Sequence, residues 1–353
     1  MNVSAPMRLD LDGDALVRNW KALAALSGSA ACGAAVKADG YGLGARAVVE
    51  RLAAAGCRDF FVATWAEAEV LTDIGVSISV LHGVREDDMA TATGAQSLRP
   101  TLNTPEQVRR WRSAGVGKCD VMVDTGMNRL GVSVEDVAGG LLDGLKVDTL
   151  MSHLACADDP GHLLNERQRS AFAGLAGKTD ARRMSLANSA GIALGSGYAF
   201  DLTRPGLALY GGVPVAALEG RIAQVVTPHA QILQRRSVKA GGTIGYNATF
   251  TAPRDMEVAI LNIGYADGYF RGFSDTGSAH ADGRRLPVLG RVSMDLTAIG
   301  LDTAPHLREG DWVAIDFALP AAAAASGMSQ YELLTGLGQR YERRWTAGSQ
   351  SSG

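Results

Sequence analysis

The chain has 353 residues, of which 46% are hydrophobic and 20% are charged, so it can bury a large core and is too long for one compact sandwich. The 34 basic residues nearly balance the 37 acidic ones, and a net charge of -3 without a long basic run argues against nucleic acid as a partner. The four cysteines are widely spaced and form no C-x-x-C motif, which argues against a metal site and against a disulfide framework.

The amino-terminal segment lacks the apolar core of a signal peptide. No later apolar run approaches the roughly 18 residues that span a bilayer. We therefore predict a cytoplasmic protein without a membrane partner.

A short strand is expected at residues 7–11, followed by a helix to about Leu26 that Asp12 or Asp14 can cap.

From residue 32 to about residue 221, short apolar runs alternate with segments of helical periodicity. The predicted strands are residues 32–36, 59–63, 78–81, 98–102, 120–123, 147–152, 184–187 and 202–209. The predicted helices include residues 45–55, 67–74, 105–114 (capped by Thr104), 134–142 and 163–175. About eight βα repeats match a (β/α)8 barrel of the TIM type better than a doubly wound sheet, because no G-x-G-x-x-G follows the first strand.

Beyond Arg221 the pattern changes to short β-branched runs, at residues 258–263, 287–289, 296–299 and 312–315, separated by Gly, Pro and Asp turns. A helix is expected over residues 329–340 with Ser329 as its cap. Residues 321–325 are interpreted as a loop or a helix edge, and the polar tail 348–353 as disordered.

The sequence thus predicts an α/β protein in two domains. Residues 1–221 form an N-terminal (β/α)8 barrel, whose first strand is free to pair with the second domain. Residues 222–353 form a C-terminal, mainly β-strand domain.

The segment GAAVKADGYGLG, residues 33–44, places Lys37 at the end of an apolar strand. In a parallel barrel the catalytic groups lie at the carboxyl ends of the strands. Desolvation there lowers the pKa of a lysine, so that its free amine can attack an aldehyde. Taken alone, the segment would more often be an ordinary loop lysine beside a turn.

Two later strand ends offer groups for an anion, in the region of a barrel where phosphate usually binds. Asn188 and Ser189 follow the seventh strand, and Ser189 offers a hydroxyl and the free N–H groups of a helix start. The eighth strand carries Arg204 and Gly206, and the glycine lets the backbone approach a ligand. Each segment alone is more often a cap or a turn, but together they favour a cofactor phosphate.

The fifth and sixth strands also end in polar groups. The motif VDTGMNRLG, residues 123–131, contains Arg129, and His153 ends the sixth strand. A lone histidine is more often a hydrogen-bonded core residue, and its position at a strand end makes a supporting role in the site an equal alternative.

The segment AVKADGYGLGA resembles the pyridoxal-phosphate lysine motif of the alanine racemase family. Further motifs similar to that family follow in order: VDTGMNRLG, SHLACAD, LANSAGI, RPGLALYG, TIGYNATF, IGYADGY and GRVSMD. The resemblance covers almost the whole chain. It implies a pyridoxal 5'-phosphate enzyme that racemises alanine, supplies D-alanine for peptidoglycan, and works as a homodimer with shared active sites.

The resemblance also assigns roles to single residues. Lys37 would bind the cofactor as a Schiff base. Its phosphate would contact Tyr41, Ser189, Gly206, Leu207 and Tyr265. Arg204 would face the pyridine nitrogen, with His153 supporting it and Asn188 in the same pocket. Arg129 would position the substrate carboxylate, and Met294, with Asp295 near it, would reach the substrate site of the partner subunit.

Racemisation takes a proton from one face of the α-carbon and returns one on the other, so it needs two bases on opposite faces. The resemblance implies Lys37 for the D-face and Tyr246, from the second domain of the other subunit, for the L-face. Without the resemblance, Tyr246 would rank as a surface or core tyrosine. Pyridoxal phosphate delocalises the carbanion, and an arginine, which only donates hydrogen bonds, would leave the ring nitrogen unprotonated and suppress transamination.

Two positions depart from the family pattern. Many members carry a carbamylated lysine seven residues before the arginine of the DTGMxRLG motif, and here that position is Met122, so another group must hold Arg129. Ser293 replaces the more common cysteine, a change expected to be minor.

Racemisation of serine or of several amino acids remains an alternative, because one methylene or hydroxyl in the substrate changes its binding free energy by only about 1–3 kcal/mol. A non-catalytic pyridoxal-phosphate-binding protein is a further alternative, although such proteins lack the second domain.

Overall fold

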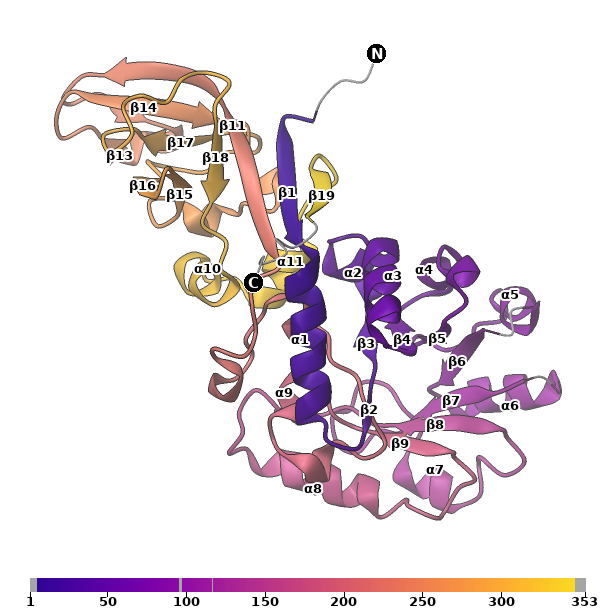
Figure 1. The fold of residues 1–353 in the computed structure, drawn as a ribbon. Helices are drawn as coiled ribbons and strands as arrows, with labels where there is room; N and C mark the ends of the chain where they lie inside the picture. The colour runs from indigo at the N-terminus through magenta and orange to yellow at the C-terminus, as the bar shows by residue number, and fades with distance from the viewer. Residues whose placement is uncertain (1–4, 95–96, 116, 347–353) are drawn as a thin grey trace, which may run out of the picture. The chain divides into compact units, whose positions relative to one another are not determined.

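The computed structural model describes residues 5–94, 97–115 and 117–346, so the predicted disordered tail lies outside the described residues. The chain divides into two compact units (Figure 1). The barrel unit comprises residues 16–209 and 213–223, and the β unit comprises the described parts of residues 1–15, 210–212 and 224–353. Helix α1, Gly13–Leu26, runs from one unit into the other, and Asp12 caps it by accepting a hydrogen bond from the backbone N of Ala15 at 2.8 Å.

The barrel unit is built on parallel strands in chain order. They are β2 (Ala31–Cys32), β3 (Ala34–Ala35), β4 (Asp59–Val62), β5 (Ser77–Val80), β6 (Leu98–Leu102), β7 (Cys119–Met122), β8 (Val147–Met151), β9 (Arg183–Ser185) and β10 (Leu202–Thr203). Strands β3 to β9 form one continuous sheet, each paired with the next, and β10 pairs with β2.

Backbone hydrogen bonds along β10 close this sheet into a barrel. On one side, Arg204 N donates to Ala187 O at 2.8 Å, beyond the end of β9. On the other side, Gly33 N donates to Thr203 O at 2.9 Å and Ala35 N donates to Pro205 O at 2.8 Å. Because β2 and β3 together make one strand interrupted at Gly33, the described barrel has the eight strands that the sequence predicts.

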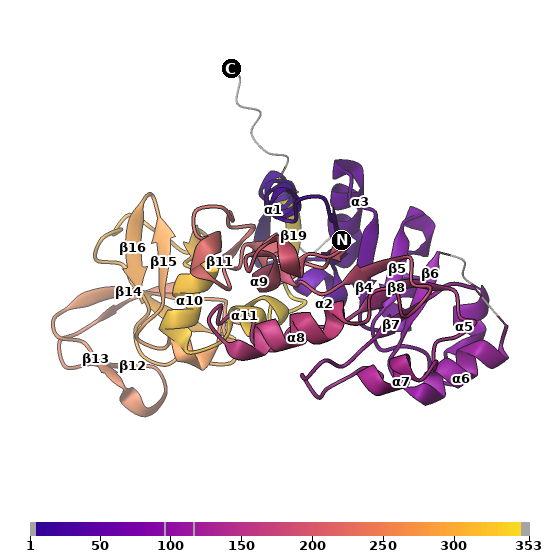
Figure 2. The same cartoon turned by 90° about the horizontal axis from the view of Figure 1, so that it is seen from below.

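Helices connect successive strands of the barrel unit. They are α2 (Lys37–Tyr41), α3 (Ala45–Ala55), α4 (Trp65–Glu69), α5 (Met89–Gly94), α6 (Pro105–Ser113), α7 (Val134–Ala138), α8 (Leu163–Ala173) and α9 (Ser189–Ile192). The unit also contains four 3-10 turns among its described residues: η1 (Thr72–Ile74), η2 (Ser196–Tyr198), η3 (Leu207–Tyr210) and η4 (Ala216–Leu218). Figure 2 shows α5, α6 and α7 along the outer margin of the unit, beside the strands.

Buried charges lie at the amino-terminal end of the barrel strands, opposite the end expected to carry chemistry. Arg183, the first residue of β9, donates to Asp59 at the start of β4 and to Asp148 in β8, each at 3.0 Å. Arg99 in β6 approaches the fully buried Asp120 of β7 at 3.4 Å. These two arginines and three aspartates leave one formal negative charge, and Arg182, which contacts Asp148 at 2.9 Å, supplies the further positive charge. The buried charges at this end are therefore paired, as buried charges must be.

The β unit contains a mixed sheet of eight strands and one small hairpin within the described residues. Its strands are β1 (Met7–Asp12), β11 (Val226–Val238), β12 (Thr243–Ile244), β13 (Phe250–Thr251), β14 (Met256–Leu261), β15 (Ser278–Ala281), β16 (Arg284–Pro287), β17 (Thr297–Gly300), β18 (Trp312–Ile315) and β19 (Glu342–Thr346). The long strand β11 pairs with β1, β14 and β18, and β1 also pairs with β19. Helices α10 (Leu319–Ser326) and α11 (Gln330–Thr335) and the 3-10 turns η5 (Tyr246–Ala248), η6 (Tyr265–Asp267) and η7 (Arg271–Phe273) complete the unit.

Several sequence expectations need correction. The predicted helix over residues 329–340 ends at Thr335 as α11, and the one over residues 134–142 ends at Ala138 as α7. The eighth barrel strand was expected to extend to residue 209, but β10 ends at Thr203 and the chain turns into η3. Pro205 has no N–H to continue the ladder, which explains the early end. Residues 321–325 are neither loop nor edge but the body of α10, with Pro320 in its first turn and Gly327 as a left-handed C-cap. The predicted helix over residues 67–74 is divided into α4 and η1.

Candidate active site

Lys37 lies at the carboxyl end of the first barrel strand and begins α2. Part of its side chain is exposed to solvent, but the protein around the amine desolvates it, which lowers the pKa of Lys37. The positive charge of Arg129 lowers this pKa further, and the carboxylate of Glu67 opposes the change. An accessible amine with a lowered pKa is suited to attack an aldehyde.

The turn after Lys37 has an unusual backbone. Ala38, Asp39, Gly40 and Tyr41 all have positive φ angles, between 51° and 63°. Residues other than glycine rarely adopt this left-handed conformation, and such strain is concentrated at functional sites. Side-chain carboxylates hold the turn at both ends: Glu67 accepts from Ala38 N at 2.7 Å, and Asp39 accepts from Ala45 N at 2.8 Å.

Tyr41, Ser189 and the backbone of residues 206–208 meet at the carboxyl end of the barrel. The Oγ of Ser189 accepts hydrogen bonds from the backbone N of Gly206 at 3.0 Å and of Ala208 at 3.2 Å. A Cβ on Gly206 would lie 2.2 Å from the hydroxyl of Tyr41, so only glycine fits there. The group offers hydroxyls and backbone N–H donors, including that of Leu207, which are the donors that bind phosphate.

Arg204 is buried beneath this group. Its guanidinium donates to Ser152 O at 2.6 Å and to the Ser185 hydroxyl, and lies 5.9 Å from the ring centre of Phe61. Burial lowers the pKa of Arg204 to about 10, although Asp120 opposes the change. At neutral pH Arg204 is therefore a cation that can only donate hydrogen bonds.

His153 follows β8 at the same end of the barrel. Burial lowers the pKa of His153 to about 3, with further contributions from the positive charges of Arg204, Arg129 and Lys37. The imidazole is therefore neutral at physiological pH. Asn188, by contrast, uses its side-chain oxygen to cap α9, accepting from Gly191 N at 2.9 Å, so the cap interpretation holds for this residue.

The loop that carries Arg129 is held by the side-chain carboxylate of Asp124. Asp124 accepts hydrogen bonds from the backbone N of Gly126, Met127 and Arg129, and Gly131 lies so close to Asp124 that a Cβ would meet its nitrogen at 2.4 Å. Among the described residues, no carboxylate forms an ion pair with the Arg129 guanidinium. Met122, the last residue of β7, is buried and offers no polar group.

The β unit carries the remaining predicted residues. Tyr246 in η5 and Met294 are exposed, at 68% and 54%, whereas Tyr265 in η6 is half-buried. Tyr265 N donates to Ser293 O at 3.0 Å, and Arg271 lies over the Tyr265 ring at 5.2 Å. Ser293 accepts from Leu296 N and donates to Leu296 O, which closes the turn that presents Met294.

One arginine holds both of these loops. Arg340 contacts Asp267 in η6 through two nitrogens, at 2.6 and 2.9 Å, and its third nitrogen reaches Asp295 at 2.8 Å. Asp267 is fully buried and also accepts from Gly264 N at 3.0 Å. The loop of Tyr265 and the loop of Met294 are therefore fixed to one another.

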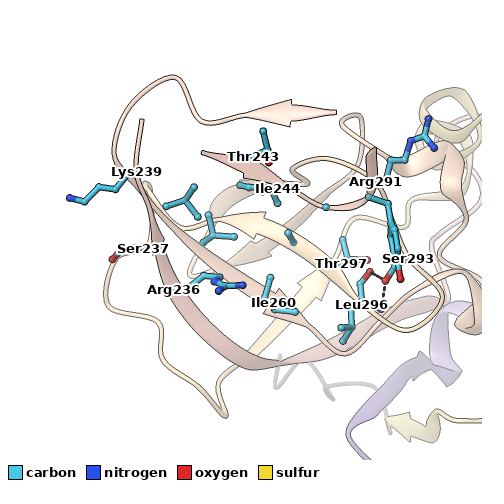
Figure 3. Close-up of a pocket in the computed structure, with 15 residues that line it drawn as sticks. Arg236, Ser237, Lys239, Thr243, Ile244, Ile260, Arg291, Ser293, Leu296 and Thr297 are labelled. Carbon is cyan, nitrogen blue, oxygen red and sulfur yellow. Dashed lines mark hydrogen bonds between the residues drawn. The ribbon is translucent and has the colours of Figure 1, made fainter. Parts of the chain in front are cut away.

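A pocket of about 660 Å³ lies within the β unit (Figure 3). Tyr246 is among the residues that line it. Ile244, Ile260 and Leu296 give it an apolar lining, and Arg236 and Arg291 add positive charge. Tyr246 is thus one of the residues that line a pocket with both apolar and positively charged side chains.

Family models match nearly the whole chain. The model described as alanine racemase, N-terminal domain, matches residues 11–214, and the model described as alanine racemase, C-terminal domain, matches residues 225–345. The chain belongs to the alanine racemase family. The family resemblance and the predicted barrel with a second, mainly β domain are thereby confirmed.

Individual relatives agree with the family assignment. The alanine racemase of Acidiphilium cryptum is 41% identical over 349 residues, which cover 95% of this chain and 97% of the relative. A catabolic alanine racemase of Agrobacterium fabrum is 39% identical, with 96% of this chain and 91% of the relative covered. Full-length relatives thus carry both biosynthetic and catabolic names.

Solved structures of the family superpose closely on this fold. The alanine racemase of Bartonella henselae, with covalently bound pyridoxal phosphate, gives a TM-score of 0.89 at 33% identity and covers 97% of this chain and 100% of that one. The biosynthetic alanine racemase of Pseudomonas aeruginosa gives 0.88 at 32% identity, covering 98% and 100%.

All nine predicted site residues of the barrel unit lie on segments at the same end of the barrel. Lys37, Tyr41, Arg129, His153, Asn188, Ser189, Arg204, Gly206 and Leu207 all lie on segments at the carboxyl ends of the strands. Sequence reasoning missed Glu67, although T-x-x-E at residues 64–67 marks a capping box. Its bond to Ala38 joins residues 29 apart in the chain, and no local pattern predicts such a contact.

Proposed function

We propose that this chain interconverts L-alanine and D-alanine with pyridoxal 5'-phosphate bound through Lys37. The observation that carries the proposal is the amine of Lys37: it is accessible, its pKa is lowered, and it lies at the carboxyl end of the first barrel strand beside the positive charge of Arg129. A surface lysine would have neither the desolvated amine nor a neighbouring cation.

The donors at this end of the barrel fit such a cofactor. Tyr41, Ser189 and the backbone of Gly206 and Leu207 supply hydroxyl and N–H donors to a phosphate, and the absence of a side chain on Gly206 leaves room for the Tyr41 hydroxyl beside them. Tyr265 would complete the phosphate contacts from the β unit. Arg204 would face the ring nitrogen, with His153 and Asn188 beside it.

Pyridoxal phosphate supplies a carbonyl carbon for an amine and a ring that spreads the charge left when the α-proton departs. Lys37 accepts and returns the proton on the D-face of the α-carbon, since its lowered pKa leaves more of it as the free base. Arg204 only donates hydrogen bonds and therefore leaves the ring nitrogen unprotonated. This limits side reactions that need a more electron-withdrawing ring.

Tyr246 serves as the base on the L-face and comes from the partner subunit. Its 68% exposure within its own chain supports this role, because an exposed tyrosine beside a pocket is available to a second copy. We propose domains over residues 1–221, whose first strand pairs with the second domain, and 222–353, which supplies Tyr246 and Met294 to the partner subunit. The enzyme is then a homodimer with shared active sites.

Arg129 holds the substrate carboxylate at the barrel end through the paired N–H donors of its guanidinium. Since Met122 provides no carbamate, the hydrogen bonds from its loop to Asp124 are what fix the Arg129 backbone. We place the enzyme in the cytoplasm, where D-alanine for peptidoglycan is made. None of the described helices is long and apolar enough to cross a bilayer.

The decisive experiment is hydrogen exchange at the α-carbon in heavy water, with a panel of L-amino acids, added cofactor and chiral analysis. We expect both enantiomers with deuterium at the α-carbon, fastest from alanine. Fastest exchange from serine or a larger residue would keep the mechanism and change the substrate. No exchange from any amino acid would favour a cofactor-binding protein without activity.

A further inference from the structure

Glu67 contacts more of the chain than its helix cap requires. It belongs to a capping box with Thr64: Thr64 Oγ1 accepts from Glu67 N at 3.3 Å, and Glu67 Oε2 accepts from Thr64 N at 3.1 Å. The same Oε2 accepts from Ala63 N at 2.7 Å, at the end of β4. The other oxygen, Oε1, accepts from Ala38 N at 2.7 Å, the amide directly after Lys37.

Two other capping boxes in the chain behave differently. Asp136 accepts from Ser133 N at 3.2 Å, and Glu332 accepts from the N and the hydroxyl of Ser329. Each of these carboxylates bonds within its own cap. A capping box thus needs only one carboxylate oxygen on the cap amide, and the bond from Glu67 to Ala38 is additional.

The turn that Glu67 reaches is one that needs support. The left-handed conformation costs about 1–2 kcal/mol for each residue other than glycine, and the turn contains Ala38, Asp39 and Tyr41 in addition to Gly40. A bond from a carboxylate to a backbone N–H is among the stronger hydrogen bonds in proteins. The contact between Glu67 and Ala38 therefore fixes the backbone at the residue next to Lys37.

The charges around Lys37 also depend on Glu67. Arg129 lowers the pKa of the Lys37 amine, and Glu67 raises it. His153 lies within electrostatic range of Lys37, but its imidazole is neutral and adds no charge. Glu67 is therefore the carboxylate that balances the positive charge of Arg129 at this amine.

We propose that Glu67 is a positioning residue for Lys37: one carboxylate oxygen ties the second barrel strand to its helix, and the other fixes the turn that aims the Lys37 amine. The inference rests on the proposed role of Lys37 as the cofactor lysine. It adds to that role the residue that holds the lysine in place and sets the charge beside it.

The test is Glu67→Gln in the full-length protein. The amide keeps the size of the side chain but loses the charge and one of the two acceptor oxygens. With cofactor removed, acetylation of Lys37 is followed against pH by mass spectrometry of its peptide. We expect the reaction of Lys37 in the variant to begin at lower pH than in the wild type, because the carboxylate that favours the ammonium is gone. On adding cofactor back, we expect binding to weaken about tenfold.

Asp136→Asn is the matched control, since it makes the same chemical change in a capping box that bonds only within itself. It should leave the Lys37 profile and the cofactor affinity as in the wild type. The inference is overturned if Glu67→Gln matches the wild type in both measurements, or if Asp136→Asn shifts them equally. Should Glu67→Gln fail to fold, Glu67→Asp, which keeps the charge but shortens the reach, replaces it, and a cofactor affinity equal to wild type would overturn the inference.

Lys37→Ala separates this inference from the proposed function. If that variant keeps the visible absorbance of bound cofactor, the role of Lys37 itself is wrong. If it loses the absorbance while Glu67→Gln behaves as the wild type, only the role of Glu67 is wrong.

Discussion

Gly206 and Tyr41 lie so close together that a methyl group added to Gly206 would clash with the Tyr41 side chain. In Gly206→Ala the new Cβ would fall 2.2 Å from the Tyr41 hydroxyl and 2.9 Å from its Cζ. Tyr41 is buried and cannot move without disturbing its neighbours, so the phosphate donors would be displaced. We expect the affinity for pyridoxal phosphate to fall roughly tenfold or more, as measured by titration of its absorbance.

Gly197→Ala is the control for this change. A Cβ there would meet only the Cδ of Arg169, at 3.9 Å. It should leave the cofactor affinity unaltered. Equal affinities in Gly206→Ala and the wild type would show that Tyr41 does not contribute to the phosphate site.

His153 provides a prediction about pH. Its pKa in the folded protein is about 3, well below the ordinary 6.5, because burial and three nearby cations disfavour the imidazolium. Between pH 3 and pH 6.5, His153 is therefore protonated in the unfolded chain but neutral in the folded protein. The contribution of His153 to the free energy of unfolding is therefore fully present above about pH 6.5. It is lost as the pH falls towards 3, by at most about 1.4 kcal/mol per pH unit.

The measurement is nuclear magnetic resonance of isotope-labelled histidine, with the His153 signal assigned by its loss in His153→Gln. We expect no titration of that signal across the neutral range, and a weaker acid dependence of the urea midpoint in the variant, which carries no titratable group there. A signal that titrates near pH 6.5 would contradict the buried, neutral imidazole.

The elements of the β unit that bear Tyr265 and Met294 depend on Arg340. Arg340→Met would leave the fully buried Asp267 with the N–H of Gly264 but without its cation, and the loss of a partner at a buried polar group costs roughly 1–3 kcal/mol. Asp295→Asn would break only the exposed contact, which contributes less than about 1 kcal/mol. We expect a lowered Tm in the first variant, and in the second an unchanged Tm with a raised KM for alanine.

The two variants check each other. If Arg340→Met unfolds, Asp295→Asn still tests whether the connection between the loops matters for the substrate. An unchanged KM in Asp295→Asn would mean that Met294 is held by the Ser293 turn alone.

An element could be predicted from the sequence when the residues that determine it lie within a few positions of one another in the chain. Strands β4, β6 and β8 follow from apolar runs, and α6 follows from Thr104 and Pro105, because these signals lie within a few residues. Strand β11 was not predicted, since its second half carries Gln234, Arg235 and Arg236 and its pairing with β1 and β14 comes from distant parts of the chain. The early end of β10, by contrast, has a local cause, because Pro205 has no N–H to continue the ladder.

For the whole molecule, the barrel order was predictable from the alternation of strands and helices, and the candidate site followed from its position at the strand ends. The charges at the other end of the barrel were not. Asp59, Arg99 and Arg183 contact one another only because the barrel closes and brings together strands far apart in sequence. The contact between Arg340 and Asp267 was also not predictable, because these residues are 73 positions apart and come together only when the β unit folds.

The shared active site is a property of the dimer and is tested by mixing two inactive variants. Lys37→Ala lacks one base, and Tyr246→Phe lacks the other but should still bind cofactor. In a hybrid dimer, one site would combine the barrel of the Tyr246→Phe chain with Tyr246 from the Lys37→Ala chain, and both bases would be present. With random exchange of equal amounts, half the dimers would be hybrids, each with one competent site, so about a quarter of the wild-type activity should return. If subunit exchange is demonstrated with two distinguishable tags and no activity returns, each site is built within one chain, and the exposure of Tyr246 needs another explanation.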